Sequence, residues 1–149
     1  MQARIKDPVA VMQEAVQPLV TLGAIVSSGP IPAVTRELVH LRVSQINGCA
    51  VCVDMGISKA EDTPQRLAAV AVWRDAPFFT DAERAALALA ESMTRIADEI
   101  DRVPDAVWAD AARHYDEPAL ASLVLHIAVT NLYNRINVAT RQVAGVRSW

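Results

Sequence analysis

The chain has 149 residues, a formal net charge of −3 and an apolar content of 52%, to which aromatic side chains contribute only 5%. This length suits a single folded domain with a buried core, and the lack of a basic stripe argues against nucleic acid as a partner. The charged N-terminus does not resemble a signal peptide, and prolines and glycines interrupt the uncharged stretch 15–35, so we expect a cytoplasmic protein without a membrane partner.

Helix signals recur along the first half of the chain, and strand signals are weak. Pro8 opens a first predicted helix that Pro18 is expected to bend, and residues 27–32 form a loop. A second helix is predicted over residues 33–46, and the Asn47-Gly48 pair ends it. A third helix begins in the segment that follows this pair.

Capping signals mark the helices of the second half. Thr63 is a predicted N-cap followed by a proline, and Thr80 with Glu83 fits a capping box at the start of a helix that runs to about Ile96. Prolines at 104 and 118 mark the starts of the last two helices. We therefore predict an all-α fold, a single domain over residues 1–149, with about six or seven helices.

The chain has two cysteines, Cys49 and Cys52, three residues apart at the start of the third predicted helix. This spacing places both thiols on one side of a helix, whose positive end favours the thiolate. A thiolate can attack a peroxide and become a sulfenic acid, which the second thiol converts to a disulfide. Two other interpretations remain: cysteines that are merely buried, and a zinc site completed by two of His40, His114 and His126.

The run from Glu37 to Met55 contains Asn-Gly-Cys-Ala-Val-Cys-Val-Asp-Met and resembles the signature of the alkylhydroperoxidase D-like (AhpD-like), or carboxymuconolactone decarboxylase, family. The resemblance continues through residues 66–87 and 130–137, so it covers most of the chain. It implies a compact helical domain that assembles as a trimer or hexamer, and the high apolar content agrees with a homo-oligomer. We expect neither a metal nor an organic cofactor.

The same resemblance implies a function and a role for each site residue. The protein would be an antioxidant oxidoreductase that reduces organic hydroperoxides with electrons from an unidentified dithiol reductant. Cys52 would attack the peroxide, Cys49 would be the resolving thiol, and Glu37 would be the carboxylate of a proton relay. The lactone decarboxylase chemistry of the family is less favoured, since it does not use a cysteine pair.

One position departs from the family's peroxidases, which carry a histidine four residues after the second cysteine, where this chain has Gly56. General base assistance contributes typically about 10²–10⁴-fold, so its loss would weaken peroxide reduction. His40, three residues after Glu37 on the same predicted helix, is a candidate substitute. For both Glu37 and His40, the alternative is a surface or packing role. The alternative function of the protein is that of a non-catalytic oligomeric scaffold or a thiol redox sensor.

The last predicted helix carries more polar residues than its apolar surroundings suggest. We interpret them as hydrogen-bond partners for helix ends or an interface, with a pocket-lining role as the alternative; they are Asn131, Asn134, Arg135 and Asn137. We expect His126 to be a core or interface histidine with its hydrogen bonds satisfied, and His114 to be exposed.

Overall fold

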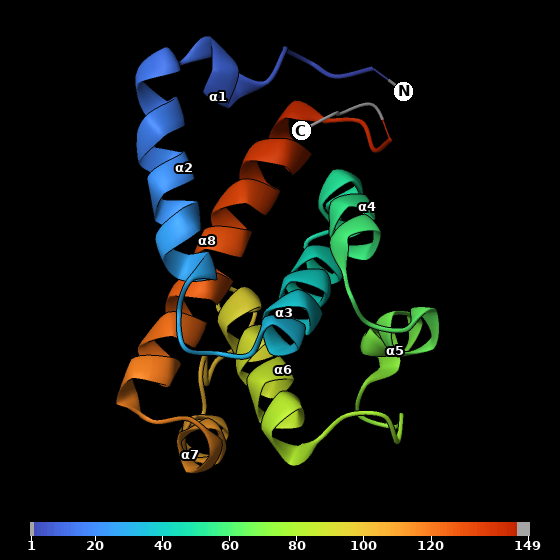
Figure 1. Ribbon diagram of the computed structural model, residues 1–149, viewed down its shortest axis with the longest axis vertical. Helices are drawn as coiled ribbons and strands as arrows, with labels where there is room; N and C mark the ends of the chain where they lie inside the picture. The colour runs from blue at the N-terminus through green and yellow to red at the C-terminus, as the bar shows by residue number, and fades with distance from the viewer. Residues whose placement is uncertain (1, 146–149) are drawn as a thin grey trace.

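The computed structural model describes residues 2–145, and this part of the chain contains helices and no strands (Figure 1). The all-α prediction is confirmed. In chain order the elements are α1 (Pro8–Val11), α2 (Gln13–Ser27), α3 (Ala33–Ile46), α4 (Ala50–Lys59), α5 (Pro64–Ala69), the 3-10 helix η1 (Val70–Val72), α6 (Asp81–Thr94), α7 (Asp105–His114) and α8 (Glu117–Thr140).

The eight α-helices of the described residues exceed the predicted six or seven because the first predicted helix is two. The chain breaks at Met12, whose φ of −94° and ψ of 77° lie outside the helical range, and not at Pro18, which lies inside α2. Asp7 caps α1 by accepting a hydrogen bond from the Val9 amide at 3.0 Å. The break that divides the predicted helix therefore follows this short capped turn and does not fall at the proline.

The predicted capping signals form as expected. Thr80 and Glu83 make a reciprocal capping box: the Thr80 hydroxyl accepts from the Glu83 amide at 3.2 Å, and the Glu83 carboxylate accepts from the Thr80 amide at 2.8 Å. The helix that they start, α6, ends at Thr94, two residues before the expected Ile96. Helices α3 and α4 lie where the sequence predicts them.

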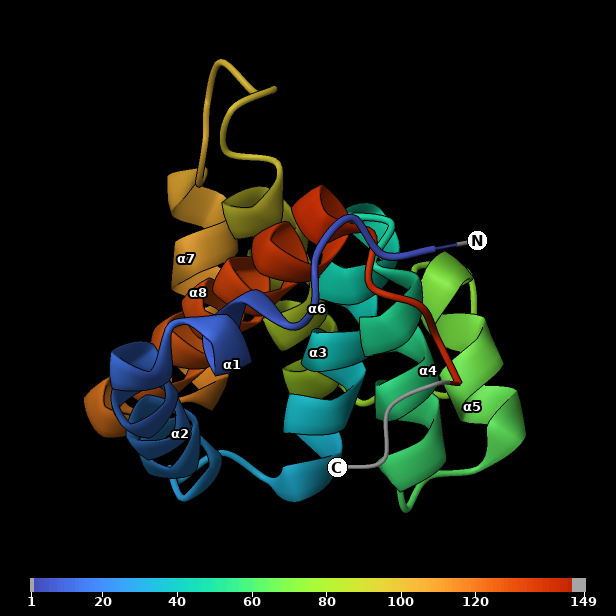
Figure 2. The same cartoon turned by 90° about the horizontal axis from the view of Figure 1, so that it is seen from above.

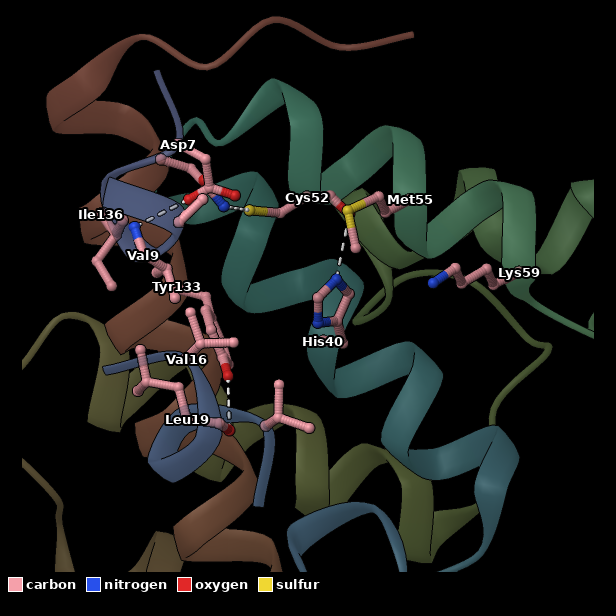
Figure 3. Close-up of a pocket in the computed structure, with 13 residues that line it drawn as sticks. Asp7, Val9, Val16, Leu19, His40, Cys52, Met55, Lys59, Tyr133 and Ile136 are labelled. Atoms are coloured by element: carbon pink, nitrogen blue, oxygen red, sulfur yellow. Dashed lines mark hydrogen bonds between the residues drawn. The ribbon is translucent and has the colours of Figure 1, made fainter. Parts of the chain in front are cut away.

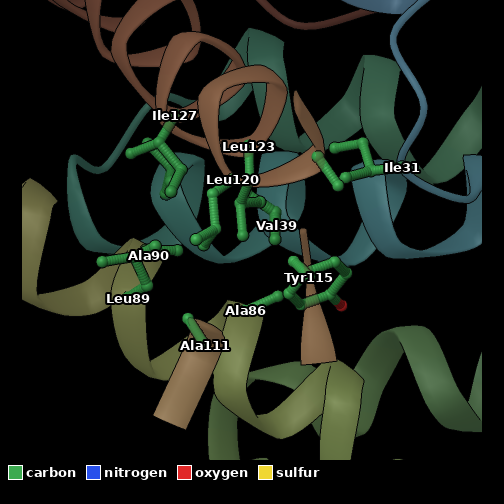
Figure 4. Close-up of a cluster of buried hydrophobic side chains, with 12 residues drawn as sticks. Ile31, Val39, Ala86, Leu89, Ala90, Ala111, Tyr115, Leu120, Leu123 and Ile127 are labelled. Atoms are coloured by element: carbon green, nitrogen blue, oxygen red, sulfur yellow. The ribbon is translucent and has the colours of Figure 1, made fainter. Parts of the chain in front are cut away.

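Helices α3, α6 and α8 lie at the centre of the molecule, with α7 packed on α6 and α4 on α3. Figure 4 shows the apolar cluster between them, formed by Ile31, Val39, Val43, Ala86, Leu89, Ala90, Ala111, Tyr115, Ala119, Leu120, Leu123 and Ile127. A second cluster lies under α5 and η1 and contains Leu38, Leu41, Leu67, Val70, Trp73, Ala76, Phe79 and Leu87. The two clusters fix both faces of α3.

A buried carboxylate ties α3 to α6 and η1. Glu91 of α6 accepts hydrogen bonds from Arg42 Nε at 2.6 Å and from Trp73 Nε1 at 3.1 Å, and it pairs with Arg74. Burial works to raise the pKa of Glu91, but these hydrogen bonds outweigh it and hold the pKa below its usual value. The carboxylate is therefore charged and paired, and it stabilises the position of α3.

The N-terminal segment crosses the end of α8, as Figure 2 shows from above. The Arg4 amide donates to the Thr140 carbonyl oxygen at 2.9 Å, and the Gln142 side chain donates to the Ile5 carbonyl oxygen at 3.2 Å. These contacts hold α1 and α2 over one face of α8 (Figures 1 and 2). Within residues 2–145, no helix is long and apolar enough to cross a bilayer.

Candidate functional site

The turn between α3 and α4 places the two cysteines at the start of α4. Gly48 adopts a φ of 65°, a left-handed conformation that favours glycine. The Cys49 amide donates to the Ser44 carbonyl oxygen at 3.0 Å, and Cys49 is the N-cap residue of α4. Cys49 and Cys52 form a disulfide with their Cα atoms 5.3 Å apart. The predicted placement of the pair at a helix start, within disulfide reach, is confirmed.

Buried asparagine side chains of α8 hold this turn in place through hydrogen bonds. The Asn47 side chain donates to the Oδ1 atoms of Asn131 and Asn134, both at 2.9 Å, and Asn134 donates to the Ser44 hydroxyl at 3.1 Å. Asn134 is fully buried. These two asparagines are therefore hydrogen-bond partners of a helix end, as the sequence predicts, and they hold the cysteine turn against α8.

An apolar pocket of about 440 Å³ lies beside the disulfide, between α1, α2, α3, α4 and α8 (Figure 3). Its lining consists of Asp7, Val9, Ala10, Val16, Leu19, Val20, His40, Cys52, Met55, Lys59, Tyr133, Ile136 and Asn137. Cys52 is the cysteine that lines it. Both cysteines are nearly inaccessible, with Cys49 2% and Cys52 3% exposed. A pocket of this size accommodates a small organic molecule.

His40 extends from α3 to the first turn of α4, and Figure 3 shows its ring below Met55, with a dashed line for its hydrogen bond. Its Nε2 lies 3.1 Å from the Cys52 carbonyl oxygen. Because a carbonyl oxygen only accepts, Nε2 carries the proton and Nδ1 holds the lone pair. Burial lowers the pKa of His40, and the nearby Lys59 charge adds to this effect, although the hydrogen bond to Cys52 opposes it. The imidazole is therefore neutral near pH 7.

The same imidazole fills the space beside Gly56. A Cβ atom added to Gly56 would lie 3.0 Å from Cδ2 and 3.5 Å from Nε2 of His40. The first of these distances is shorter than nearly all real Cβ contacts. A side chain at position 56 and the ring of His40 would therefore occupy the same space, and in this protein the ring of His40 occupies it.

Glu37 lies beside a second cavity, of about 300 Å³, and is not among the residues that line the pocket with Cys52. Its Oε2 accepts a hydrogen bond from the Glu61 amide at 3.3 Å. His40 lines both cavities. The structure thus brings Cys49, Cys52 and His40 together and places Glu37 at the second cavity, which His40 also lines.

The other two histidines behave as the sequence predicts. His126 Nε2 lies 3.0 Å from the Arg36 carbonyl oxygen, and burial lowers the pKa of His126 to about 4. His114 is exposed at the end of α7. In the described part of the chain, no group of three or more histidine, cysteine, aspartate or glutamate side chains is arranged to hold a metal ion.

Two features of the site escape prediction from the sequence. The apolar side chains of α2 form a pocket wall, but their helical spacing does not say which surface they face. Asn137 donates through Nδ2 to Cys52 Sγ at 3.4 Å, across 85 residues of chain. The unusual polarity of the last helix was the available signal for Asn137, and its pocket-lining role was the alternative interpretation.

Residues 15–92 match the carboxymuconolactone decarboxylase family. The uncharacterized protein YdfG of Bacillus subtilis (strain 168) is 44% identical over 108 residues, which cover 70% of this chain and 72% of that protein. The uncharacterized protein YnjA of Escherichia coli (strain K12) is 37% identical over 113 residues, which cover 74% of this chain and 60% of that protein.

Solved structures share the fold. ATU0492 from Agrobacterium tumefaciens, a protein of unknown function provisionally assigned to antioxidant defence as AhpD, superimposes with a TM-score of 0.91 and 30% identity over 98% of this chain and 100% of that chain. The debrominase Bmp8 without ligand has a TM-score of 0.78 and 19% identity over 93% of this chain and 75% of that chain. The predicted AhpD-like architecture is confirmed.

Proposed function

Since this chain belongs to the carboxymuconolactone decarboxylase family and carries a cysteine pair beside a pocket, we propose that it is a thiol-dependent peroxidase for organic hydroperoxides. The proposal depends on one observation: Cys52, half of a disulfide, lies on the wall of a mostly apolar pocket of about 440 Å³. The hydrocarbon body of an organic hydroperoxide would be buried against that wall, whereas hydrogen peroxide would leave the wall uncovered.

In the proposed cycle the Cys52 thiolate attacks the distal oxygen of the hydroperoxide. An S–O bond forms, the O–O bond breaks, and the departing alkoxide takes a proton and leaves as the alcohol. The Cys49 thiol then attacks the sulfenic acid sulfur, so that a disulfide forms and water leaves. The two thiols have lost two electrons, which an external dithiol returns by thiol–disulfide exchange. The disulfide of the structure corresponds to the oxidised end of this cycle.

His40 is the proposed proton acceptor for the Cys52 thiol. It is neutral near pH 7 and lines the pocket with Cys52. Because its Nε2 donates to the Cys52 carbonyl oxygen, the thiol proton would reach the lone pair on Nδ1 by way of a water in the pocket. Glu37 precedes it by one turn on α3 and shares the second cavity with it. In the proposed relay Glu37 assists from the second cavity, where it exchanges protons with the surroundings.

A single-turnover experiment tests the proposal. Reduced protein mixed with one equivalent of cumene hydroperoxide is expected to lose both thiols, become about 2 Da lighter and release one equivalent of alcohol. Hydrogen peroxide is expected to react roughly tenfold more slowly, because it gains no apolar contact in the pocket. Protein with alkylated cysteines is the control.

Turnover with excess dithiothreitol distinguishes a peroxidase from a redox sensor and from a non-catalytic scaffold. A peroxidase keeps consuming hydroperoxide, whereas a redox sensor is oxidised once and only slowly. Thiols that survive the organic hydroperoxide would contradict the proposal and favour the scaffold.

We also propose that the protein is a homo-oligomer, a trimer or hexamer, in which a second copy covers apolar side chains of α2 and α8. Ile25 on α2 is 60% exposed and Leu125 on α8 is 49% exposed. Exposed apolar surface of this kind is typical of subunit contacts.

Light scattering at micromolar concentration is expected to give a multiple of the monomer mass of 16.1 kDa. Ile25→Glu is expected to shift the mass toward the monomer, because it would bury a charge in the contact. Val72→Glu, at an equally exposed position on η1, is the matched control and is expected to keep the parent mass. A monomeric parent protein would overturn this proposal.

A further inference from the structure

The last turn of α8 brings an amide group to the sulfur that faces the pocket. Asn137 Nδ2 donates a hydrogen bond to Cys52 Sγ at 3.4 Å, a contact drawn as a dashed line in Figure 3. A disulfide sulfur is a weak acceptor, but a thiolate carries a full negative charge. The same hydrogen bond therefore becomes stronger when Cys52 is reduced and ionised.

The end of α8 fixes the backbone at Asn137 independently of the sulfur. The Asn137 carbonyl oxygen accepts from the Gln142 amide at 3.0 Å, and Arg141 closes the helix in a left-handed conformation with a φ of 53°. The contact between Arg4 and Thr140 fastens the same turn to the N-terminal segment. The backbone from which the Asn137 side chain extends is thus fixed before the disulfide opens.

The other polar groups that face the pocket either oppose a thiolate or favour it less directly. Asp7 brings a negative charge, Lys59 is exposed at the rim, and His40 contacts the Cys52 carbonyl oxygen with its proton-bearing nitrogen. Burial raises the pKa of Tyr133, so its hydroxyl stays neutral. Among the described residues, Asn137 supplies the side-chain hydrogen bond that reaches this sulfur.

We propose that Asn137 is a catalytic residue that stabilises the Cys52 thiolate and thereby makes Cys52, rather than Cys49, the attacking thiol. The consequence for peroxide reduction rests on the proposed function. The same contact acts when the disulfide is reduced: a thiolate of the dithiol reductant attacks Cys49, a new S–S bond forms to Cys49, the old bond breaks, and Cys52 leaves as the thiolate.

The test is a thiol titration in reduced protein that carries Cys49→Ser, so that Cys52 is the thiol that ionises. Thiolate absorbance near 240 nm is followed against pH. Asn137→Leu is expected to raise the pKa of Cys52 by roughly one unit, since it removes a hydrogen bond to a charged group. Asn137→Asp is expected to raise it further, because a carboxylate repels the thiolate. Alkylation by iodoacetamide near neutral pH should slow roughly tenfold in Asn137→Leu.

Asn137→Gln keeps the amide on a longer side chain and is expected to give a pKa between those of the parent and Asn137→Leu. Val138→Ala changes the neighbouring exposed residue of the same turn and is expected to leave the pKa unchanged. Circular dichroism and thermal unfolding show which variants are folded. Asn137→Asp is nearly isosteric and keeps the test decisive if the leucine variant does not fold.

The outcomes for Asn137 and for the peroxidase proposal are separable. A Cys52 pKa that is the same in the parent, Asn137→Leu and Asn137→Asp would overturn the role of Asn137, even if peroxide is turned over. The predicted order of pKa values without any peroxide turnover would support Asn137 and contradict the proposed function. If Asn137 had only a structural role, its replacement would change thermal unfolding without producing the predicted order of Cys52 pKa values.

Discussion

Replacing Cys52 with serine is expected to reduce hydroperoxide turnover to the background rate, whereas replacing Cys49 is expected to stop the cycle one step later. Cys52 lines the pocket, so its sulfur meets the substrate. A serine hydroxyl at position 52 is not ionised near neutral pH and is a poor nucleophile. In Cys49→Ser the first step remains, but no second thiol is available to resolve the sulfenic acid.

Two measurements distinguish these variants. Release of alcohol from cumene hydroperoxide is expected at one equivalent for Cys49→Ser and at none for Cys52→Ser. A dimedone-type reagent is expected to label Cys49→Ser after peroxide and to leave Cys52→Ser unlabelled. The reverse pattern would assign the attack to Cys49. An unchanged steady-state rate in Cys52→Ser would eliminate peroxide reduction at this site.

His40→Ala is expected to lower kcat/KM for an organic hydroperoxide by about 10²–10⁴-fold, the usual contribution of a general base. The double variant His40→Ala/Gly56→His is expected to recover part of this loss, because the new imidazole enters the same space from α4. Gly56→His alone is expected to give no gain. Its Cβ would lie 3.0 Å from Cδ2 of His40, so the two rings would exclude each other.

The matched control is His40→Ala/Gly56→Ala, which adds a Cβ at position 56 without an imidazole and should stay as slow as His40→Ala. The pH profile gives a second measurement. Since burial lowers the pKa of His40 from 6.5, the neutral base persists below that pH, and the wild-type rate should fall only at more acidic pH. This acid limb should disappear in His40→Ala. A gain from Gly56→His in the wild-type background would show instead that the relay is incomplete.

Features that depend on residues close together in the chain could be predicted from the sequence. The capping box of Thr80 and Glu83 joins residues three apart, and Gly48 ends α3 because its own backbone adopts a left-handed conformation. The cysteine spacing likewise permits a local disulfide, which the structure contains. The family resemblance supplied the expected roles of Cys49, Cys52 and Glu37. It did not indicate which residue replaces the histidine that is absent at position 56.

The first helix and the position of Glu37 show where local signals are insufficient. Pro18 stays within α2, and the break falls at Met12, after the short helix α1 that Asp7 caps. Glu37 precedes His40 by one turn, yet the packing of α3 places it at the second cavity. Helical spacing predicts which side chains share a face and does not predict what that face contacts.

The all-α class, most helix boundaries and a cysteine pair within disulfide reach could be predicted from the sequence, because these features arise from interactions within a few residues. The surroundings of Cys52 depend instead on how the helices pack. Their packing brings the imidazole of His40 into the space beside Gly56 and the amide of Asn137 to the sulfur. Those contacts join α3 to α4 and α8 to α4, and they exist only once the helices have packed and buried their apolar faces.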